Sequence, residues 1–177
     1  MDTLAHILEK FQIRLADQKM PIDLPAATRT DLAALFSELG FKVGAEIGTE
    51  SGLFSEVLLK SNRGLRLYCV DAWKAYRGYR DHVTQAKMDG FFEAATRRLQ
   101  PYDCELIRQF SMDAVKRFES GCLDFVYIDA NHGFNWVVMD VIEWAKRVRA
   151  GGIVSNEAEG GRTCSGEHEI VEAFAQL

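Results

Sequence analysis

Residues 43–52 read Val-Gly-Ala-Glu-Ile-Gly-Thr-Glu-Ser-Gly: a short apolar strand runs into an acidic residue and a glycine-rich turn before a new helix. Gly48 and Gly52 let the backbone turn tightly and approach a ligand without a Cβ in the way, and Glu46 can hold a positively charged group. The spacing Gly48-x-x-x-Gly52 departs from the G-x-G-x-x-G pattern of dinucleotide sites. The stretch therefore predicts a nucleotide-like cofactor other than NAD.

Strand-like and helix-like patterns alternate outward from this stretch. The predicted strands are 43–47, 65–70, 104–108, 123–128 and 152–155, and the helices that follow them are 53–61, 90–99, 112–119, 134–149 and 167–176. This alternation predicts an α/β fold with a doubly wound, mostly parallel sheet and helices on both faces. The 177 residues fit one domain, with a helical cover over 1–40 and an α/β core over 41–177.

Three helices have distinct apolar faces. The first 19 residues predict one amphipathic helix, and a second has Thr30 as its N-cap and Gly40 as its stop. The helix over 134–149 should bury a wide apolar stripe against the sheet and end at Gly151-Gly152. The residues of that stripe are Phe134, Val137, Val138, Val141, Ile142, Ala145 and Val148.

Composition limits the functional classes. A net charge of −5 argues against a general nucleic-acid binder, since such proteins carry a basic patch for phosphates. No apolar run reaches the roughly 18 residues that span a bilayer, and the N-terminus lacks the features of a signal peptide, so no membrane partner and a cytoplasmic location are expected. The cysteines, which are widely spaced, suit reduced thiols; they are Cys69, Cys104, Cys122 and Cys164.

Polar residues end all five predicted strands, where open parallel sheets bind their ligands. Asp71 lies 23 residues beyond Gly48, near the distance at which an acid accepts hydrogen bonds from both ribose hydroxyls. Asp71 could instead cap a helix or pair with Lys74. The other strand ends contribute Glu46-Ile47-Gly48, Phe110-Ser111-Met112, Asp129-Ala130-Asn131-His132 and Ser155-Asn156-Glu157.

Residues 72–90, rich in aromatic and basic side chains, form the least regular segment. They predict a mobile lid over the site, or else a solvated helix or loop with no role. Trp73, Tyr76 and Tyr79 could stack on a sugar face or on a catechol ring.

Taken together, these motifs resemble class I S-adenosylmethionine-dependent methyltransferases, and most closely the catechol and macrocin O-methyltransferase-like enzymes. The resemblance covers residues 30–176 and rests on Glu46-Ile47-Gly48-x-x-x-Gly52, Val70-Asp71, the segment 124–132, and Gly151-Gly152-Ile153-Val154. It implies a Rossmann-like methyltransferase fold and S-adenosylmethionine as the cofactor. The implied cofactor contacts are Glu46 near the methionine amino group, Gly48, Thr49 and Gly52 at the methionine portion, Asp71 on the ribose, Ser111 and Met112 beside the adenine, and Asp129.

The resemblance also implies a catalytic half. In metal-dependent relatives the acid after the fourth strand and a pair after the fifth hold Mg²⁺, and the residue three beyond the first acid is the base. Asp129, Asn156 and Glu157 fall at the metal positions, and His132 falls at the position of the base. Oxygen ligands suit a hard divalent cation, and a histidine, whose unperturbed pKa is about 6.5, suits proton transfer near neutral pH.

The chain departs from the pattern in two places. Relatives commonly carry His-Asp or Asp-Asn after the fifth strand, where this chain has Asn156-Glu157, so metal dependence stays open. Relatives also continue into two further strands, whereas this chain ends at Leu177, inside the predicted last helix. The C-terminal strands are therefore expected to be missing, leaving a sheet edge that a partner subunit of a homo-oligomer could cover.

The sequence thus favours an O-methyltransferase that acts on a hydroxylated small molecule such as a sugar, a polyol or a catechol, with His132 and Asp129 as catalytic residues. Two alternatives stay open. One is a non-catalytic or truncated module that acts through cofactor binding or assembly. The other is an NAD-dependent oxidoreductase, which the glycine spacing disfavours.

Overall fold

The computed structural model describes residues 2–14, 27–76, 84–158 and 170–175. These residues contain a six-stranded sheet of order β3-β2-β1-β4-β5-β6. Its first five strands are parallel and β6 is antiparallel to β5. The order reverses between β1 and β4, which is where doubly wound sheets bind ligands. The strands are β1 (Val43–Ile47), β2 (Arg66–Asp71), β3 (Cys104–Arg108), β4 (Leu123–Ile128), β5 (Val148–Ala158) and β6 (Ile170–Ala175).

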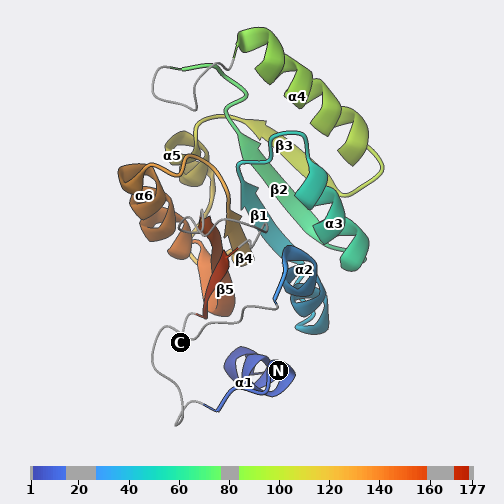
Figure 1. Cartoon of the computed structure of the whole chain (residues 1–177), viewed down its shortest axis with the longest axis vertical. Coiled ribbons are helices and arrows are strands. Elements are labelled where there is room, and N and C mark those ends of the chain that lie inside the picture. Colours follow the sequence, from blue (N-terminus) through green and yellow to red (C-terminus); the bar gives the residue numbers. More distant parts are fainter. Residues whose placement is uncertain (1, 15–26, 77–83, 159–169, 176–177) are drawn as a thin grey trace, which may run out of the picture.

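Helices cover both faces of the sheet, as Figure 1 shows. One face carries α2 (Arg29–Glu38), α3 (Leu53–Ser61) and α4 (Gln85–Leu99), and α1 (Thr3–Lys10) packs against the edge of this layer. The other face carries α5 (Ser111–Ala114), a 3₁₀ turn (Val115–Arg117) and α6 (Phe134–Ala145). Each layer encloses its own hydrophobic cluster. The doubly wound α/β fold predicted from the sequence is confirmed. Among the described residues, no helix combines the length and apolar character needed to cross a bilayer.

The N-terminal helices differ from the predicted ones. The first helix ends at Lys10, and residues 15–19 of its predicted span lie outside the described residues. The N-cap of α2 is Thr28, not Thr30, because Thr28 and Asp31 form a capping box of two reciprocal hydrogen bonds. Lys10 then joins α1 to α2 by donating to Glu38 over 2.6 Å.

Only part of the predicted apolar stripe of α6 packs against the sheet: Val141 and Ala145 contact the cluster on this face, and Val148, after the helix, is buried in it. Phe134, Val138 and Ile142, three members of the predicted stripe, are exposed at 80%, 37% and 52%, whereas Asp140 and Trp144 are buried. Apolar residues occupy nearly every side of this helix, so periodicity alone could not select the packed face. The helix also ends early: Val148 begins β5, and Gly151-Gly152 lies inside that strand.

The C-terminal segment corrects a second prediction. Residues 170–175, expected to be helical, form β6, which pairs along β5 from Ala158 to Ile153. A short apolar run does not distinguish helix from strand, and here the open edge of β5 offers backbone groups to pair with. One of the strands expected to be missing is therefore present. The edge of β5 is thus covered by β6 of the same chain, and the predicted homo-oligomer stays a prediction.

Candidate cofactor and active site

The carboxyl ends of β1, β2 and β4 meet at one edge of the sheet. The N–H of Gly48 donates to Val70 O over 2.8 Å, and the N–H of Asp129 donates to Ile47 O over 2.7 Å. A Cβ built on Gly48, whose φ is +98°, would lie 1.9 Å from the carbonyl oxygen of Asp129. The turn after β1 approaches the end of β4 this closely because residue 48 has no side chain.

Glu46 lies within β1, paired with Tyr127 of β4, and its carboxylate points toward α3. The hydroxyl of Ser55 donates a hydrogen bond to this carboxylate, whose residue is 2% exposed. Burial raises the pKa of Glu46 to about 7, and the hydrogen bond from Ser55 opposes part of that rise. A positively charged ligand beside Glu46 would favour the ionised form of this carboxyl group and so lower its pKa.

The turn between β1 and α3 contains a buried hydroxyl. Thr49 is 4% exposed, and its hydroxyl lies beside the carboxylate of Glu46, whose pKa it lowers against the larger effect of burial. Gly52 caps α3 with a φ of +75° and donates its N–H to Thr49 O over 2.8 Å. Buried hydroxyls are nearly always paired with protein, water or ligand, so Thr49 offers a polar contact at this turn.

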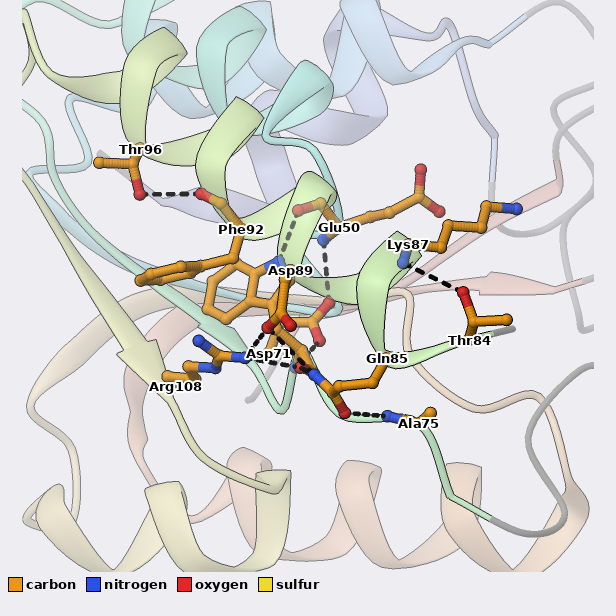
Figure 2. Close-up of polar contacts among 11 residues, drawn as sticks. Glu50, Asp71, Ala75, Thr84, Gln85, Lys87, Asp89, Phe92, Thr96 and Arg108 are labelled. Carbon is orange, nitrogen blue, oxygen red and sulfur yellow. Dashed lines mark hydrogen bonds and ion pairs between the residues drawn. The ribbon is translucent and has the colours of Figure 1, made fainter.

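Asp71 ends β2 beside this turn and holds it through the backbone (Figure 2). Its Oδ2 accepts from the N–H of Glu50 over 2.9 Å, and its Oδ1 accepts from the N–H of Trp73 over 2.8 Å. Burial raises the pKa of Asp71, and the two backbone hydrogen bonds oppose the rise. Each carboxylate oxygen keeps further acceptor capacity for a ribose hydroxyl. The described contacts of Asp71 do not include the two alternatives expected from the sequence, a helix cap and an ion pair with Lys74.

The described residues that follow β2 are held in place by hydrogen bonds of Trp73. Trp73 is fully buried and donates its Nε1–H to Glu50 O over 2.7 Å, so it cannot stack on a substrate as predicted. Its carbonyl accepts from Gln85 and from Arg108, both over 3.1 Å (Figure 2). Residues 77–83 of the predicted lid, which include Tyr79, lie outside the described residues, and residues 85–90 belong to α4.

Ser111 uses its side chain to join α5 to α6. Its hydroxyl is hydrogen-bonded to the carboxylate of Asp140 and accepts from Trp144 Nε1–H over 2.8 Å. Burial raises the pKa of Asp140 to about 6, and the contact with Ser111 opposes the rise. Met112 is half-buried against the cluster on this face. Ser111 therefore forms a structural link that the sequence did not reveal, and the adenine contact of Ser111 and Met112 stays a prediction.

Asp129 and His132, the predicted catalytic pair, are brought together after β4. Asp129 Oδ1 lies 3.6 Å from His132 Nε2, and both side chains are 22% exposed. On its other side, Asp129 Oδ2 lies 3.5 Å from Nη1 of Arg29, at the start of α2. The neighbouring Asn131 donates to the hydroxyl of Tyr76 over 3.1 Å. The acid is thus flanked by an imidazole and a guanidinium.

The predicted metal residues of β5 lie beside this group. Asn156 pairs with Ile128, the last residue of β4, and its buried Oδ1 has no partner among the described residues. Glu157 pairs with Val171 within the sheet, but its side chain is not described. Within the described residues, no group of three or more His, Cys, Asp or Glu side chains could hold a metal ion.

Sequence reasoning missed Arg29, Ser55 and Asp140. Ser55 follows Gly52 by three residues, so its position on the first turn of α3 could have been noticed. Asp140 lies between two apolar runs of α6, Val137-Val138-Met139 and Val141-Ile142, which is a signal of a buried and paired acid. Nothing in the sequence pattern of α2 connects Arg29 to a strand end 100 residues away.

The fold is shared with solved methyltransferases. One is "O-Methyltransferase TomG from Streptomyces achromogenes involved in Tomaymycin synthesis in complex with SAM", with a TM-score of 0.56 and 20% identity over 89% of this chain and 65% of that chain. Another is the O-methyltransferase from Bacillus cereus in complex with SAH, with a TM-score of 0.54 and 20% identity over 89% and 66%. A third is cofactor-bound Rv0187 from MTB, with a TM-score of 0.55 and 22% identity over 88% and 64%.

This chain therefore spans slightly less than two thirds of the length of these three structures, and the likeness to them shows the fold. No curated protein matches the sequence. The family model described as a methyltransferase domain matches residues 45–156, which extend from β1 into β5 and include the turn at Gly48, Asp71, Asp129 and His132. The chain belongs to this methyltransferase domain family.

Proposed function

We propose that the protein is an S-adenosylmethionine-dependent O-methyltransferase that acts on a hydroxyl group of a small molecule, such as a sugar, a polyol or a catechol-like compound. The observation that carries this proposal is that the Gly48 turn, Asp71 and Asp129 meet at one edge of the sheet. Membership of the methyltransferase domain family supports it. Among structures of the same fold, the two O-methyltransferases described above are complexes with SAM and with SAH.

The residues at this edge fit the chemistry of the cofactor. Glu46 supplies a buried acid for an ammonium group, and Asp71 supplies acceptor oxygens for ribose hydroxyls. Thr49 adds a buried hydroxyl beside the carboxylate of Glu46. The cofactor has no phosphate, so the glycine that dinucleotide sites use to approach a pyrophosphate is not required.

When bound, S-adenosylmethionine supplies an electrophilic methyl group on a positively charged sulfur. His132 serves as the base that accepts the proton of the acceptor hydroxyl. The carboxylate of Asp129, 3.6 Å from Nε2, favours a proton on that nitrogen and leaves Nδ1 to act. The same carboxylate stabilises the imidazolium as its charge develops.

A divalent cation such as Mg²⁺ forms the second part of the proposal. Asp129, Asn156 and Glu157 would hold it, since all three offer oxygen ligands of the kind that hard cations take. The buried Oδ1 of Asn156, beside the end of β4 and without a partner among the described residues, supports this assignment. The cation would lower the pKa of the acceptor hydroxyl and so ease its deprotonation by His132.

The proposal is tested by calorimetric titration with S-adenosylhomocysteine, followed by incubation with S-adenosylmethionine and a panel of hydroxylated acceptors. A mass gain of one methyl group on an acceptor, lost in His132→Ala and reduced by EDTA, is the expected outcome. Methylation that EDTA does not reduce would exclude a role for the cation and would leave the proposed methyltransferase activity standing. Cofactor binding without transfer to any acceptor would favour a non-catalytic module, and no binding by the folded protein would overturn the proposal.

A further inference from the structure

Arg29 places a guanidinium beside the two acids of the candidate site. Its Nη1 lies 3.5 Å from Oδ2 of Asp129, and its positive charge lowers the pKa of the buried Glu46 against the larger effect of burial. The guanidinium carbon also lies 5.7 Å from the centre of the Phe54 ring. The end of β4 and the first turn of α3 thus lie beside this one side chain.

The position of Arg29 is fixed by the start of α2. Thr28 and Asp31 close a capping box around the first turn, and α2 packs along α3. The Arg29 side chain is 25% exposed, so it is partly withdrawn from water and still reachable by a ligand. Phe54 lies two residues after Gly52, and attraction to its ring holds the planar guanidinium in place.

The proposed cofactor ends in an amino acid, which carries an ammonium and a carboxylate on the same carbon atom. An acid that binds the ammonium therefore needs a cation close by for the carboxylate. Glu46 is the proposed acid; its carboxylate accepts from Ser55, and Arg29 lies over the ring of Phe54, the residue before Ser55. Resting on the proposed function, we propose that Arg29 binds the carboxylate of the amino-acid end of S-adenosylmethionine.

Two other arginines near this region, Arg98 and Arg108, are held by partners away from Glu46 and Asp129. Arg98 donates to Ser51 O and to the carboxylate of Glu56, both over 3.1 Å. Arg108 is paired with Asp89 and donates to the carbonyl of Trp73. A guanidinium also suits this task better than an ammonium, because its planar fork can donate two parallel hydrogen bonds to a carboxylate.

Binding at Arg29 would change the surroundings of Asp129. The ligand carboxylate competes with Asp129 for the guanidinium, and the 3.5 Å contact between Arg29 and Asp129 is long enough to give way. Asp129 then remains beside His132, 3.6 Å away, with its full charge available to the imidazole and to a cation. Arg29 thus links occupation of the cofactor site to preparation of the catalytic pair.

The test compares two ligands that differ at the amino-acid end. S-adenosylhomocysteine carries the carboxylate, whereas 5′-methylthioadenosine keeps the adenosyl thioether and lacks the amino acid. Calorimetry measures both ligands against the native chain, Arg29→Gln and Arg29→Lys, with Arg117→Gln as a control. Arg117 pairs with Glu105 on β3 and makes no contact with this site that the structure shows.

We expect Arg29→Gln to weaken S-adenosylhomocysteine binding by about 10- to 100-fold, as for the loss of a hydrogen bond to a charged group, and to leave 5′-methylthioadenosine unchanged. Arg29→Lys should retain part of the affinity. Equal loss for both ligands, or full affinity of Arg29→Gln for S-adenosylhomocysteine, would overturn the assignment. If the native chain fails to bind S-adenosylhomocysteine, the proposed function itself falls, and this assignment falls with it.

Discussion

The hydroxyl of Ser55 on α3 donates a hydrogen bond to the carboxylate of Glu46 on β1, and both residues are closed off from solvent. Burial raises the pKa of Glu46 from 4.5 to about 7 despite this bond. For an acid whose pKa is higher in the folded state than in the unfolded state, the stabilising contribution is fully present below pH 4.5. It is lost as the pH rises through about 7.

Glu46→Gln should therefore stabilise the ligand-free protein at pH 8, because it removes a buried charge and keeps an acceptor for Ser55. A shift from 4.5 to about 7 corresponds to about 3 kcal/mol, which sets the upper limit of the gain. At pH 4, where both side chains are neutral, the gain should vanish. Urea unfolding at the two pH values measures it, and an equal effect at both would contradict the buried-charge explanation.

The same ionisation predicts a pH dependence of cofactor binding. The ammonium of the ligand favours ionised Glu46, so binding near pH 6 should release a proton and S-adenosylhomocysteine affinity should rise toward pH 7.5. Calorimetry in two buffers of different ionisation enthalpy counts the released protons. In Glu46→Gln both the proton release and the rise should disappear; their persistence would assign them to another group.

Asp71→Ala should weaken S-adenosylhomocysteine binding and also destabilise the fold. The change leaves the N–H groups of Glu50 and Trp73 without their acceptor, at a cost of about 1–3 kcal/mol for each one that stays buried and unpaired. Asp71→Asn keeps one side-chain oxygen and should therefore lose less ligand affinity and less stability than Asp71→Ala. Thermal unfolding and calorimetry separate the two effects, and undiminished ligand affinity in a folded Asp71→Ala protein would exclude the ribose contact.

Ser111→Ala should destabilise the protein by about 1–3 kcal/mol, because it removes the partner that Asp140 and Trp144 share. Its effect on S-adenosylhomocysteine affinity should be small, since the hydroxyl is already engaged by α6. Chemical unfolding and calorimetry on the same preparation give both values. A large loss of affinity with unchanged stability would show that the hydroxyl contacts the adenine instead.

His132→Ala should lower methyl transfer by at least about 100-fold while leaving S-adenosylhomocysteine binding intact, as expected for a base that acts on the acceptor. His6→Ala is the matched control, because His6 contacts Glu38 between α1 and α2. Single-turnover transfer, followed by mass spectrometry, measures the effect. Equal activity of the two variants would remove His132 from the catalytic role.

The sequence specified the strands more accurately than the helix surfaces. The bounds of β1, β3, β4 and α3 were predicted as the structure has them, because each is a short apolar or amphipathic run with clear turn residues at its ends. The predicted residues Gly48, Asp71, Asp129 and His132 gather at the site because parallel strands end at one edge of their sheet. This part of the site follows from topology alone.

The errors share a physical cause, which is that long-range packing decided the outcome. The buried face of α6 depends on Trp144 and Asp140 meeting Ser111 on α5, and the state of residues 170–175 depends on the edge of β5. Arg29 enters the site from a helix that precedes β1 in the chain. None of these contacts is encoded in local periodicity.

The contact of Gly48 with Asp129 has a consequence for protein engineering. A side chain at position 48 would collide with backbone, which cannot move aside as a flexible side chain can, so substitutions there should abolish folding before they change specificity. The backbone around Gly48 and Asp129 therefore cannot be changed by substitution at position 48. Libraries aimed at new acceptors should therefore leave the strand ends alone and vary the half-buried rim, beginning with Tyr76 and Asn131.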